Sequence, residues 1–302
     1  MNRSRLLVTG ATGFIGCALV PRLMQEADVT LLLLEEFGSG LALPQALKII
    51  RPHFDVVYAD LRNYATTARA VRQANPEQVI HLAAIGTTDP FLSPHRAVAH
   101  NITGTLNLLR ACFESQLNVR RLIVARTPGE NSAMNIYAAS KAAAWTFCEM
   151  YERTAGWPIV GGMIFQAYGP GQPDHLLVPA ALRAALAGEN FPLTEGRQKK
   201  DWIHIKDIVE GFVRLLHAEL PSGLTVELGT GIATAVRDVV STIYELVDRG
   251  GSPLYGVLPS RPGEENRQVA NISRLDEYLN WRPATSLREG LIDLIANVDD
   301  LL

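Results

Sequence analysis

The 302-residue chain is poor in cysteine and has no apolar run long enough to span a bilayer. Its three cysteines, Cys17, Cys112 and Cys148, are odd in number and far apart, which fits neither a metal knuckle nor a redox pair. We therefore expect reduced thiols in a cytoplasmic protein. The apolar run at residues 29–34 is far too short for a membrane helix.

A charge excess and a metal motif are also lacking. The net charge of −3 gives no reason to expect a nucleic acid or a membrane as partner. None of the seven histidines lies in a His-Glu-x-x-His motif, so we predict no catalytic metal. The first residues lead directly into a predicted strand, so no signal peptide is expected.

Strand-like and helix-like stretches alternate through the first half of the chain. Apolar strands are predicted near residues 5–9, 29–34, 56–59, 78–82, 122–125 and 159–165, and helices over residues 14–25, 64–74, 97–116 and 137–155. Strands that are apolar throughout, without alternation, indicate a parallel sheet covered on both faces. The sequence therefore predicts an α/β protein with a Rossmann-type doubly wound sheet.

The pattern loosens after residue 168. Helices predicted near residues 179–187, 208–217 and 237–249 alternate with short strands and turns rich in proline and glycine. We predict an NAD(P)-binding domain over residues 1–168, joined by a later strand near residues 225–231. Residues 169–302 are expected to form a smaller, interleaved α/β domain that mainly binds the substrate.

A glycine-rich loop follows the first predicted strand and precedes the first predicted helix. Glycine permits a tight turn and lets the backbone approach a pyrophosphate, while the helix start offers N–H groups and partial positive charge. A lone glycine triplet is weak evidence, but here the strand and the helix are both present. We expect cofactor contacts at Gly10, Thr12, Gly13, Phe14, Ile15 and Gly16.

The end of the second strand predicts the form of the cofactor. Leu33 stands where an acidic residue often binds the adenosine ribose, and Glu35 follows two residues later. The first lysine or arginine after it is Lys48, so no nearby cation is predicted to bind a 2′-phosphate. This favours NAD, with Glu35 as a cofactor contact, and does not exclude NADP.

A phenol and an ammonium lie four residues apart in Tyr137-Ala-Ala-Ser-Lys141. On a helix they share one face and reach the same ligand. A nearby cation lowers the pKa of a phenol, so Tyr137 can remove a hydroxyl proton while hydride leaves the same carbon. Thr127, at the end of the fifth strand, is the predicted third catalytic residue because its hydroxyl can polarise the substrate oxygen.

Together these residues resemble the extended short-chain dehydrogenase/reductases, in particular the NAD-dependent epimerase/dehydratase group that includes UDP-glucose 4-epimerase. The resemblance covers nearly the whole chain. It implies that Tyr137 and Lys141 also contact the cofactor. It implies further cofactor contacts at Asp60, Leu61, Leu82, Ala83, Ala84, Asn101 and Phe165, and substrate contacts at Thr127, Gln166, Lys200, Arg261 and Glu264.

The late motifs have chemistry that suits a sugar nucleotide. Arg261 and Lys200 offer cations to a diphosphate, and Glu264 can accept ribose hydroxyls. The resemblance also implies a homodimer formed through the helices near residues 101–116 and 137–155. A helix buried only within the monomer is the alternative for the second of these.

The chain departs from the family pattern at four places. Arg126 stands where relatives commonly carry a second small hydroxyl residue, and only nine residues separate Thr127 from Tyr137. Met163, Gln166 and Lys200 replace Arg, Asn and Arg. Finally, Pro128-Gly129 follows Thr127, where 4,6-dehydratases have an Asp-Glu pair as acid and base, which argues against dehydration.

Three functions remain open on the sequence. The leading hypothesis is an NAD-dependent 4-epimerase of a UDP- or other NDP-sugar, acting through a 4-keto intermediate. The first alternative is an NAD(P)H-dependent reductase of an NDP-4-keto-deoxysugar, which would use the same three residues once per turnover. The second alternative is a regulator that binds NAD without catalysis.

Overall fold

The computed structural model describes residues 3–35, 43–87, 89, 91–260, 263 and 265–297. The chain divides into two compact units, each built from two segments. The first unit comprises Met1–Met163 and Phe212–Val226, and the second comprises Ile164–Gly211 and Glu227–Leu302.

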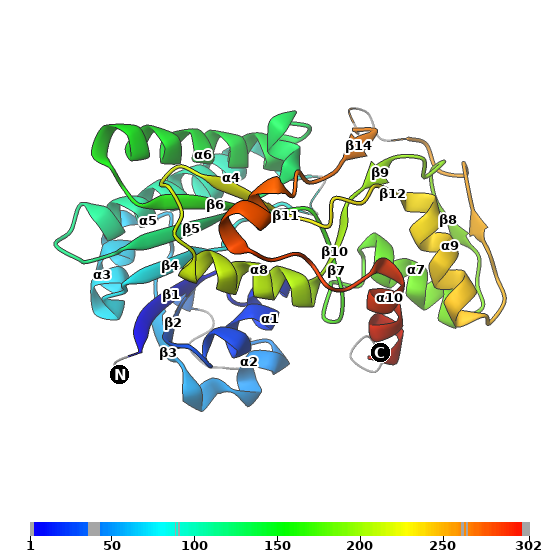
Figure 1. Ribbon diagram of the computed structural model, residues 1–302, viewed down its shortest axis with the longest axis horizontal. Helices are drawn as coiled ribbons and strands as arrows, with labels where there is room; N and C mark the ends of the chain where they lie inside the picture. Colours follow the sequence, from blue (N-terminus) through cyan, green and yellow to red (C-terminus); the bar gives the residue numbers. More distant parts are fainter. Residues whose placement is uncertain are drawn as a thin grey trace. The chain divides into compact units, whose positions relative to one another are not determined.

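A seven-stranded sheet runs through the first unit, in the order β11-β6-β5-β4-β1-β2-β3 (Figure 1). The strands are β1 (Ser4–Thr9), β2 (Ala27–Leu33), β3 (Asp55–Tyr58), β4 (Gln78–His81), β5 (Arg121–Arg126), β6 (Ile159–Ile164) and β11 (Thr225–Leu228). Neighbours from β3 to β6 pair in parallel. The chain order reverses between β1 and β4, and ligands of doubly wound sheets bind beyond the carboxyl ends of the strands at such a reversal. The predicted fold class is confirmed.

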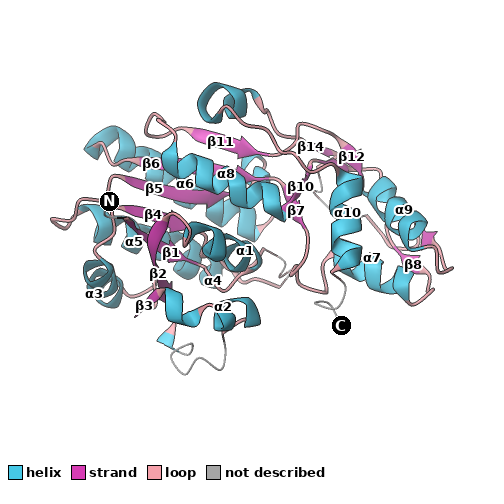
Figure 2. Ribbon diagram, turned by 60° about the horizontal axis from the view of Figure 1, so that its bottom comes forward, coloured by secondary structure: helices cyan, strands magenta, loops and turns pink. Residues whose placement is uncertain are grey.

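Helices cover both faces of this sheet (Figure 2). On one face, α3 (Tyr64–Ala74), α5 (Gly104–Phe113) and α6 (Ile136–Ala155) enclose a core that includes Val71, Leu108 and Trp145. On the other face lie α1 (Phe14–Leu23) and, from Phe212 on, α8 (Ile205–His217). Two short helices, α2 (Gln45–Ile49) and α4 (Pro94–Ala97), lie in connections between strands.

The helix predicted over residues 97–116 is interrupted in the structure. It begins as α4, passes through a π-helical segment at Val98–Thr103, and continues as α5. The π-helical segment contains Asn101, whose buried side chain hydrogen-bonds to the backbone of Ile85. Irregular turns of this kind are frequent at functional sites, and the hydrophobic periodicity of the sequence gives no sign of one.

The described part of the second unit contains helices and short strands. It includes α7 (Leu177–Leu186), α9 (Val236–Val247), α10 (Leu287–Ala296), a π-helical segment at Leu275–Leu279 and the first residues of α8. Strand β7 (Gln166–Tyr168) pairs with β10 (Trp202–His204), β8 (Phe191–Pro192) pairs with β13 (Pro253–Leu254), and β9 (Lys199–Lys200) lies between β12 (Thr234–Ala235) and β14 (Arg267–Gln268). Tyr168, Leu182, Trp202, Val239 and Leu291 belong to its core.

Candidate active site

The glycine loop joins β1 to α1 without room for side chains at two of its glycines. Gly10 has a φ of 73°, and a Cβ there would lie 2.5 Å from the backbone N of Ala83. A Cβ on Gly16 would lie 2.5 Å from the carbonyl oxygen of Gly10. Gly13 is the N-cap of α1 and no side chain caps this helix start. The loop therefore fits a pyrophosphate approaching the backbone and the helix N-terminus.

The remaining residues predicted at this loop lie around it. Thr12 is in the turn itself, and Phe14 and Ile15 open α1; all three are half-buried. Leu82, Ala83 and Ala84 leave the end of β4 beside the loop, and the backbone N of Leu82 donates to the Thr9 carbonyl. The structure thus brings these residues together, while their contact with a cofactor stays a prediction.

His81, the last residue of β4, is buried between two threonine hydroxyls. Its Nδ1 lies 2.7 Å from Thr9 Oγ1, and its Nε2 lies 2.9 Å from Thr105 Oγ1. The Thr105 hydroxyl donates to the Asn101 carbonyl, so it accepts from Nε2–H, and Nδ1 accepts from Thr9. Burial lowers the pKa of His81 from 6.5 to about 3, helped by the Lys141 ammonium. The imidazole is therefore neutral and connects β1, β4 and α5.

Asn101 extends this network to the helix that carries Tyr137. Its Oδ1 accepts from the Ile85 N–H at 2.9 Å, and its Nδ2 donates to the Ile85 carbonyl at 3.0 Å. The same Nδ2 donates to Ser140 Oγ at 2.9 Å, and the Ser140 hydroxyl donates to the Tyr137 carbonyl at 2.7 Å. Asn101 therefore positions backbone on both sides of it, and its predicted contact with the cofactor stays a prediction.

Tyr137 and Lys141 lie in the first turns of α6, which begins after Asn135 caps the Ala138 N–H. The Lys141 side chain is buried, and burial lowers its pKa while the Glu130 carboxylate opposes that change. Burial also raises the pKa of Tyr137; a hydrogen bond with Thr87 lowers it, and Glu130 raises it further. Thr87, which the sequence did not single out, is therefore a partner of the Tyr137 phenol.

Thr127 directly follows β5 and is the N-cap of a short 3₁₀ helix, Pro128–Asn131. The Glu130 N–H donates to the Thr127 carbonyl at 3.1 Å, and the Glu130 carboxylate accepts from the Thr127 N–H at 2.9 Å, in the arrangement of a capping box. The Thr127 hydroxyl makes no side-chain cap hydrogen bond to this helix, so it can donate to a ligand. The sequence did not single out Glu130, because its link to Thr127 is visible only when this segment is helical.

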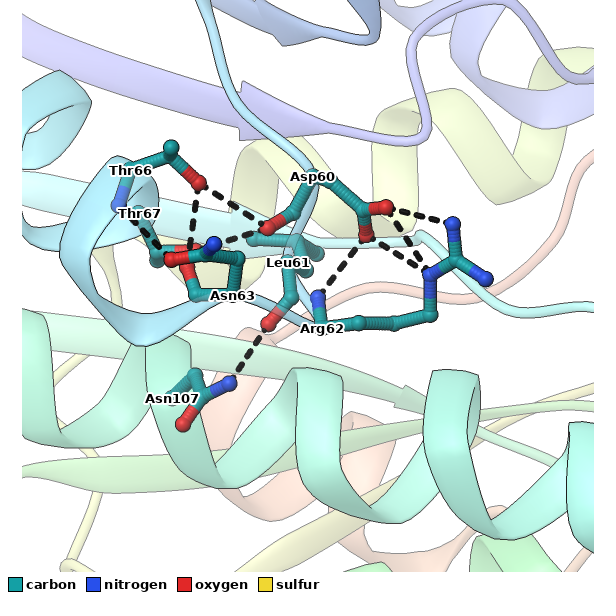
Figure 3. A network of polar contacts seen from close by, with 7 residues as sticks. All are labelled: Asp60, Leu61, Arg62, Asn63, Thr66, Thr67 and Asn107. Carbon is teal, nitrogen blue, oxygen red and sulfur yellow. Dashed lines mark hydrogen bonds and ion pairs between the residues drawn. The ribbon is translucent and has the colours of Figure 1, made fainter.

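The loop after β3 carries Asp60 and Leu61, two of the predicted cofactor contacts. The Asp60 carboxylate accepts from Nε of Arg62 at 2.9 Å, and this hydrogen bond holds its pKa below the ordinary value. Figure 3 shows the Arg62 guanidinium facing that carboxylate, and the Leu61 carbonyl facing the amide of Asn107. The Thr66 hydroxyl also donates to the Asp60 carbonyl. Asp60 and Leu61 are thus held at both ends of their loop.

Glu35, predicted at the adenosine ribose, lies just beyond β2 and is exposed. It lines a pocket of about 350 Å³ together with Tyr58, Arg69 and Gln73. Arg69 belongs to α3 and is 34 residues away in sequence, so the residues around Glu35 do not predict a cation here. The predicted ribose contact of Glu35 stays a prediction.

Two residues predicted at the substrate or cofactor lie in the second unit around β7. Gln166 opens β7, is exposed, and its backbone N donates to the Asp201 carbonyl. Phe165 is buried, and its backbone N donates to the Leu228 carbonyl. Arg261 and Glu264, the predicted nucleotide contacts, lie outside the described residues.

Lys200 is buried in the second unit. Its Nζ donates to the side-chain oxygen of Gln268 at 2.9 Å and to the Glu265 carbonyl at 3.4 Å. The adjacent Asp201 has a role that the sequence did not indicate. Its carboxylate, in a residue with no exposed surface, accepts from backbone N–H groups of three residues, which are Thr230, Gly231 and Ala270.

Residues 6–229 match the NAD dependent epimerase/dehydratase family. The chain belongs to this family. An uncharacterised UDP-glucose epimerase of Bacillus subtilis is 28% identical over 98% of this chain and 98% of its own length. A dTDP-glucose 4,6-dehydratase of Neisseria gonorrhoeae is 26% identical over 96% of this chain and 94% of its own. UDP-glucose 4-epimerase of Thermus thermophilus, solved as a complex with NAD, has a TM-score of 0.83, 26% identity, and coverage of 99% and 100%.

The predicted family is therefore confirmed, and NAD is the cofactor of that family. Membership fixes a general chemistry, because the similar proteins include both epimerases and dehydratases of sugar nucleotides. Across the described residues, no group of three or more His, Cys, Asp or Glu side chains is arranged to hold a metal ion. No helix in the same part of the chain is both long and apolar enough to cross a membrane.

Proposed function

We propose that this family member is an NAD-dependent 4-epimerase of a UDP-sugar or another NDP-sugar. The observation that carries the proposal is the Tyr137–Lys141 pair, held in the first turns of α6 by the network that runs from Thr9 through Asn101. A phenol and a buried ammonium at the carboxyl edge of a dinucleotide-binding sheet suit oxidation of a sugar hydroxyl. The UDP-glucose epimerase from Bacillus subtilis supports this choice of substrate class.

In this proposal each side chain of the chain has a separate task. Tyr137 Oη takes the proton of the sugar 4-hydroxyl and later returns it. Thr127 donates its hydroxyl hydrogen to the same sugar oxygen, and two hydrogen bonds between its backbone and Glu130 hold it in place. Bound NAD supplies the hydride acceptor and a positive ring that favours the Tyr137 phenolate.

The Lys141 ammonium is also proposed to favour the phenolate form of Tyr137. Burial alone holds Tyr137 in the protonated form, since it raises the pKa of the phenol. A neighbouring cation favours the phenolate. Lys141 is therefore proposed to offset part of the cost of burial and to keep the phenol close to deprotonation.

Several similar proteins are dehydratases, but the residues after Thr127 argue against dehydration by this chain. Pro128 and Gly129 supply no acid or base. The nearest carboxylate in that segment, Glu130, accepts from Arg126 and from the Thr127 N–H, and its side chain is 1% exposed. A carboxylate with both oxygens occupied is poorly placed to transfer protons at a sugar C5 or C6.

The test is interconversion of UDP-glucose and UDP-galactose by the purified protein with NAD, followed by NMR of the sugar anomeric protons. We expect epimerisation without net formation of reduced nicotinamide. Tyr137→Phe should lower kcat by about 1,000-fold, at the level expected for losing an acid–base residue. Tyr151→Phe removes a phenol from the same helix, where the ring stacks on Trp157, and serves as the matched control.

Other results would redirect the proposal. Stoichiometric consumption of reduced nicotinamide with an NDP-4-keto-deoxysugar, and no epimerisation, would replace it with the reductase. If Tyr137→Phe left epimerisation intact, the assignment of the phenol would be wrong. NAD binding with no turnover of any NDP-sugar would favour a regulator.

We also propose a cytoplasmic homodimer that uses α5 and α6. Ile136 and Phe147 of α6 are each 40% exposed in the single chain, which leaves apolar surface for a second copy. Light scattering after size exclusion measures the mass directly. Replacing Phe147 with Lys should shift a dimer towards monomer, and a wild-type protein that elutes as a monomer would refute this part.

A further inference from the structure

Arg126 and Glu130 form a buried ion pair beside the proposed catalytic residues. Nε and Nη2 of Arg126 both lie 2.8 Å from one carboxylate oxygen of Glu130. The other carboxylate oxygen accepts from the Thr127 N–H. The two side chains are 12% and 1% exposed. An ion pair so well buried, with its carboxylate divided between a guanidinium and a backbone N–H, differs from the exposed pairs elsewhere on this unit.

The surroundings of Arg126 are shaped to receive it. Its Nη1 donates to Thr225 Oγ1 at 2.8 Å, and its guanidinium lies 4.3 Å from the ring centre of Trp145. Gly161 on β6 leaves the space that the side chain crosses, since a Cβ there would lie 2.8 Å from Arg126 Cδ and 2.6 Å from Thr225 Oγ1. One arginine thus connects β5, β6, α6 and β11.

The 3₁₀ helix that carries Glu130 packs closely against the start of α6. A Cβ on Gly129 would lie 3.3 Å from the Cβ of Ala138, which follows Tyr137 directly. The Glu130 carboxylate is near enough to raise the pKa of both Tyr137 and Lys141. Its position therefore affects all three residues of the proposed catalytic set.

We propose that Arg126 and Glu130 are positioning residues: Glu130 fixes the backbone and hydroxyl of Thr127, and Arg126 balances the negative charge of Glu130 beside Tyr137 and Lys141. The inference rests on the proposed function. Under this proposal, an ion pair with Glu130 stands where the family pattern has a small hydroxyl residue at position 126. Neither Arg126 nor Glu130 contacts the substrate.

The charged and titratable groups around this pair define the expected effects. Arg126 comes from β5 and Glu130 from the 3₁₀ helix. The surrounding groups on other elements are Tyr137, Lys141, Cys148 and Glu149 of α6, and His81 of β4. His81 is neutral, and burial raises the pKa of Cys148 to about 12, so neither changes charge near neutral pH. Among these charges, the Glu130 carboxylate raises the pKa of the Tyr137 phenol, whereas Arg126 pairs with Glu130 and lowers the pKa of Lys141. The half-buried Glu149 accepts from the indole N–H of Trp145.

The first experiment separates the two charges. Arg126→Met leaves the Glu130 carboxylate without its counter-ion. The pH at which kcat rises should therefore increase by about one unit. Glu130→Gln leaves the Arg126 guanidinium without its counter-ion, and the pH at which kcat rises should decrease by about one unit. Tyrosinate absorbance, measured as the difference between each protein and its Tyr137→Phe counterpart, reports the same shifts without any sugar substrate. Glu114→Gln, which breaks an exposed i,i+4 pair with Arg110, is the matched control and should shift neither.

The second experiment tests the hydrogen bond between the Thr127 N–H and the side chain at position 130, in proteins that lack the ion pair. Arg126→Met/Glu130→Gln removes both charges and keeps an amide oxygen for the Thr127 N–H. Arg126→Met/Glu130→Ala removes both charges and the cap. We expect the second double variant to have a kcat about 100-fold below the first, at an unchanged KM, because Thr127 loses its position.

Equal kcat in the two double variants, or single variants whose profiles and tyrosinate titrations do not move in opposite directions, would overturn the inference. Failure of the proposed function has a different signature. In that case the wild-type protein would not epimerise any NDP-sugar, while the tyrosinate titrations would still shift in opposite directions.

Discussion

Replacement of His81 by Gln tests the buried network at the carboxyl edge of the sheet. The imidazole has a pKa lowered to about 3 by burial, whereas the same group takes up a proton near pH 6.5 when the chain unfolds. The folded pKa lies below the unfolded one, so this contribution to stability is complete above pH 6.5. It is lost as the pH falls from 6.5 towards 3, because only the unfolded chain gains a proton.

The magnitude follows from this interval. One pKa unit corresponds to about 1.4 kcal/mol, so at pH 5 the wild-type protein has lost about 2 kcal/mol through His81 alone. At pH 7 the His81→Gln variant should be less stable by about 1–3 kcal/mol, since it disturbs the hydrogen bonds to Thr9 and Thr105. At pH 5 that deficit should be smaller by about 2 kcal/mol, because Gln does not titrate.

Urea denaturation at the two pH values, followed by tryptophan fluorescence, measures the difference between the two deficits. His53→Gln, an exposed histidine of the same unit, is the control and should show no such difference. A His81→Gln deficit that is the same at pH 7 and pH 5 would refute the reasoning. It would mean that the folded protein protonates His81 as readily as the unfolded chain does.

Three further predictions concern separate parts of the site. Gly10→Ala should weaken NAD binding by more than about 10-fold in calorimetry, because the added Cβ meets the Ala83 backbone. The control is Gly156→Ala, which is also at positive φ but has no atom within 4 Å of the added Cβ. It should lower stability by only about 1 kcal/mol and leave NAD binding intact. Asp201→Ala should lower the free energy of unfolding of the second unit by about 3 kcal/mol, because several buried N–H groups lose their acceptor, and a change below about 1 kcal/mol in chemical denaturation would contradict this. Glu35→Ala should raise the ratio of NADP to NAD affinity by about 10-fold, because Arg69 then lines the pocket without a carboxylate, and an unchanged ratio in fluorescence titration would count against a ribose contact there.

The sequence predicts most of the first unit because its signals are local. Strands β1 to β6 are continuous apolar runs, and Gly10, Gly13 and Gly16 mark the turn into α1. The Tyr137–Lys141 spacing also predicts one helix face correctly, because four residues make about one turn. Each of these inferences uses residues that are close together in the chain.

The contacts that hold the site are different, because they join distant residues. Thr9 and His81 are 72 positions apart, and Arg126 and Thr225 are 99 apart. A buried threonine or histidine looks like an ordinary core residue in the sequence until the partner strand brings the other polar atom to it. Arg69 beside Glu35 is the same case, since α3, which follows β3 and packs on one face of the sheet, places the cation there.

Two of the four departures from the family pattern have a common physical origin at Glu130, and a third lies in the same segment. The nine residues between Thr127 and Tyr137 suffice because the first of them form a 3₁₀ helix that a capping box closes at Thr127. Gly129 permits that helix to approach Ala138 closely, and Glu130 provides the cap that a longer loop would have to replace. A buried carboxylate at that point requires a cation, and Arg126 is the cation. The short loop therefore depends on Glu130 as its cap, and Glu130 in turn depends on Arg126 as its counter-ion.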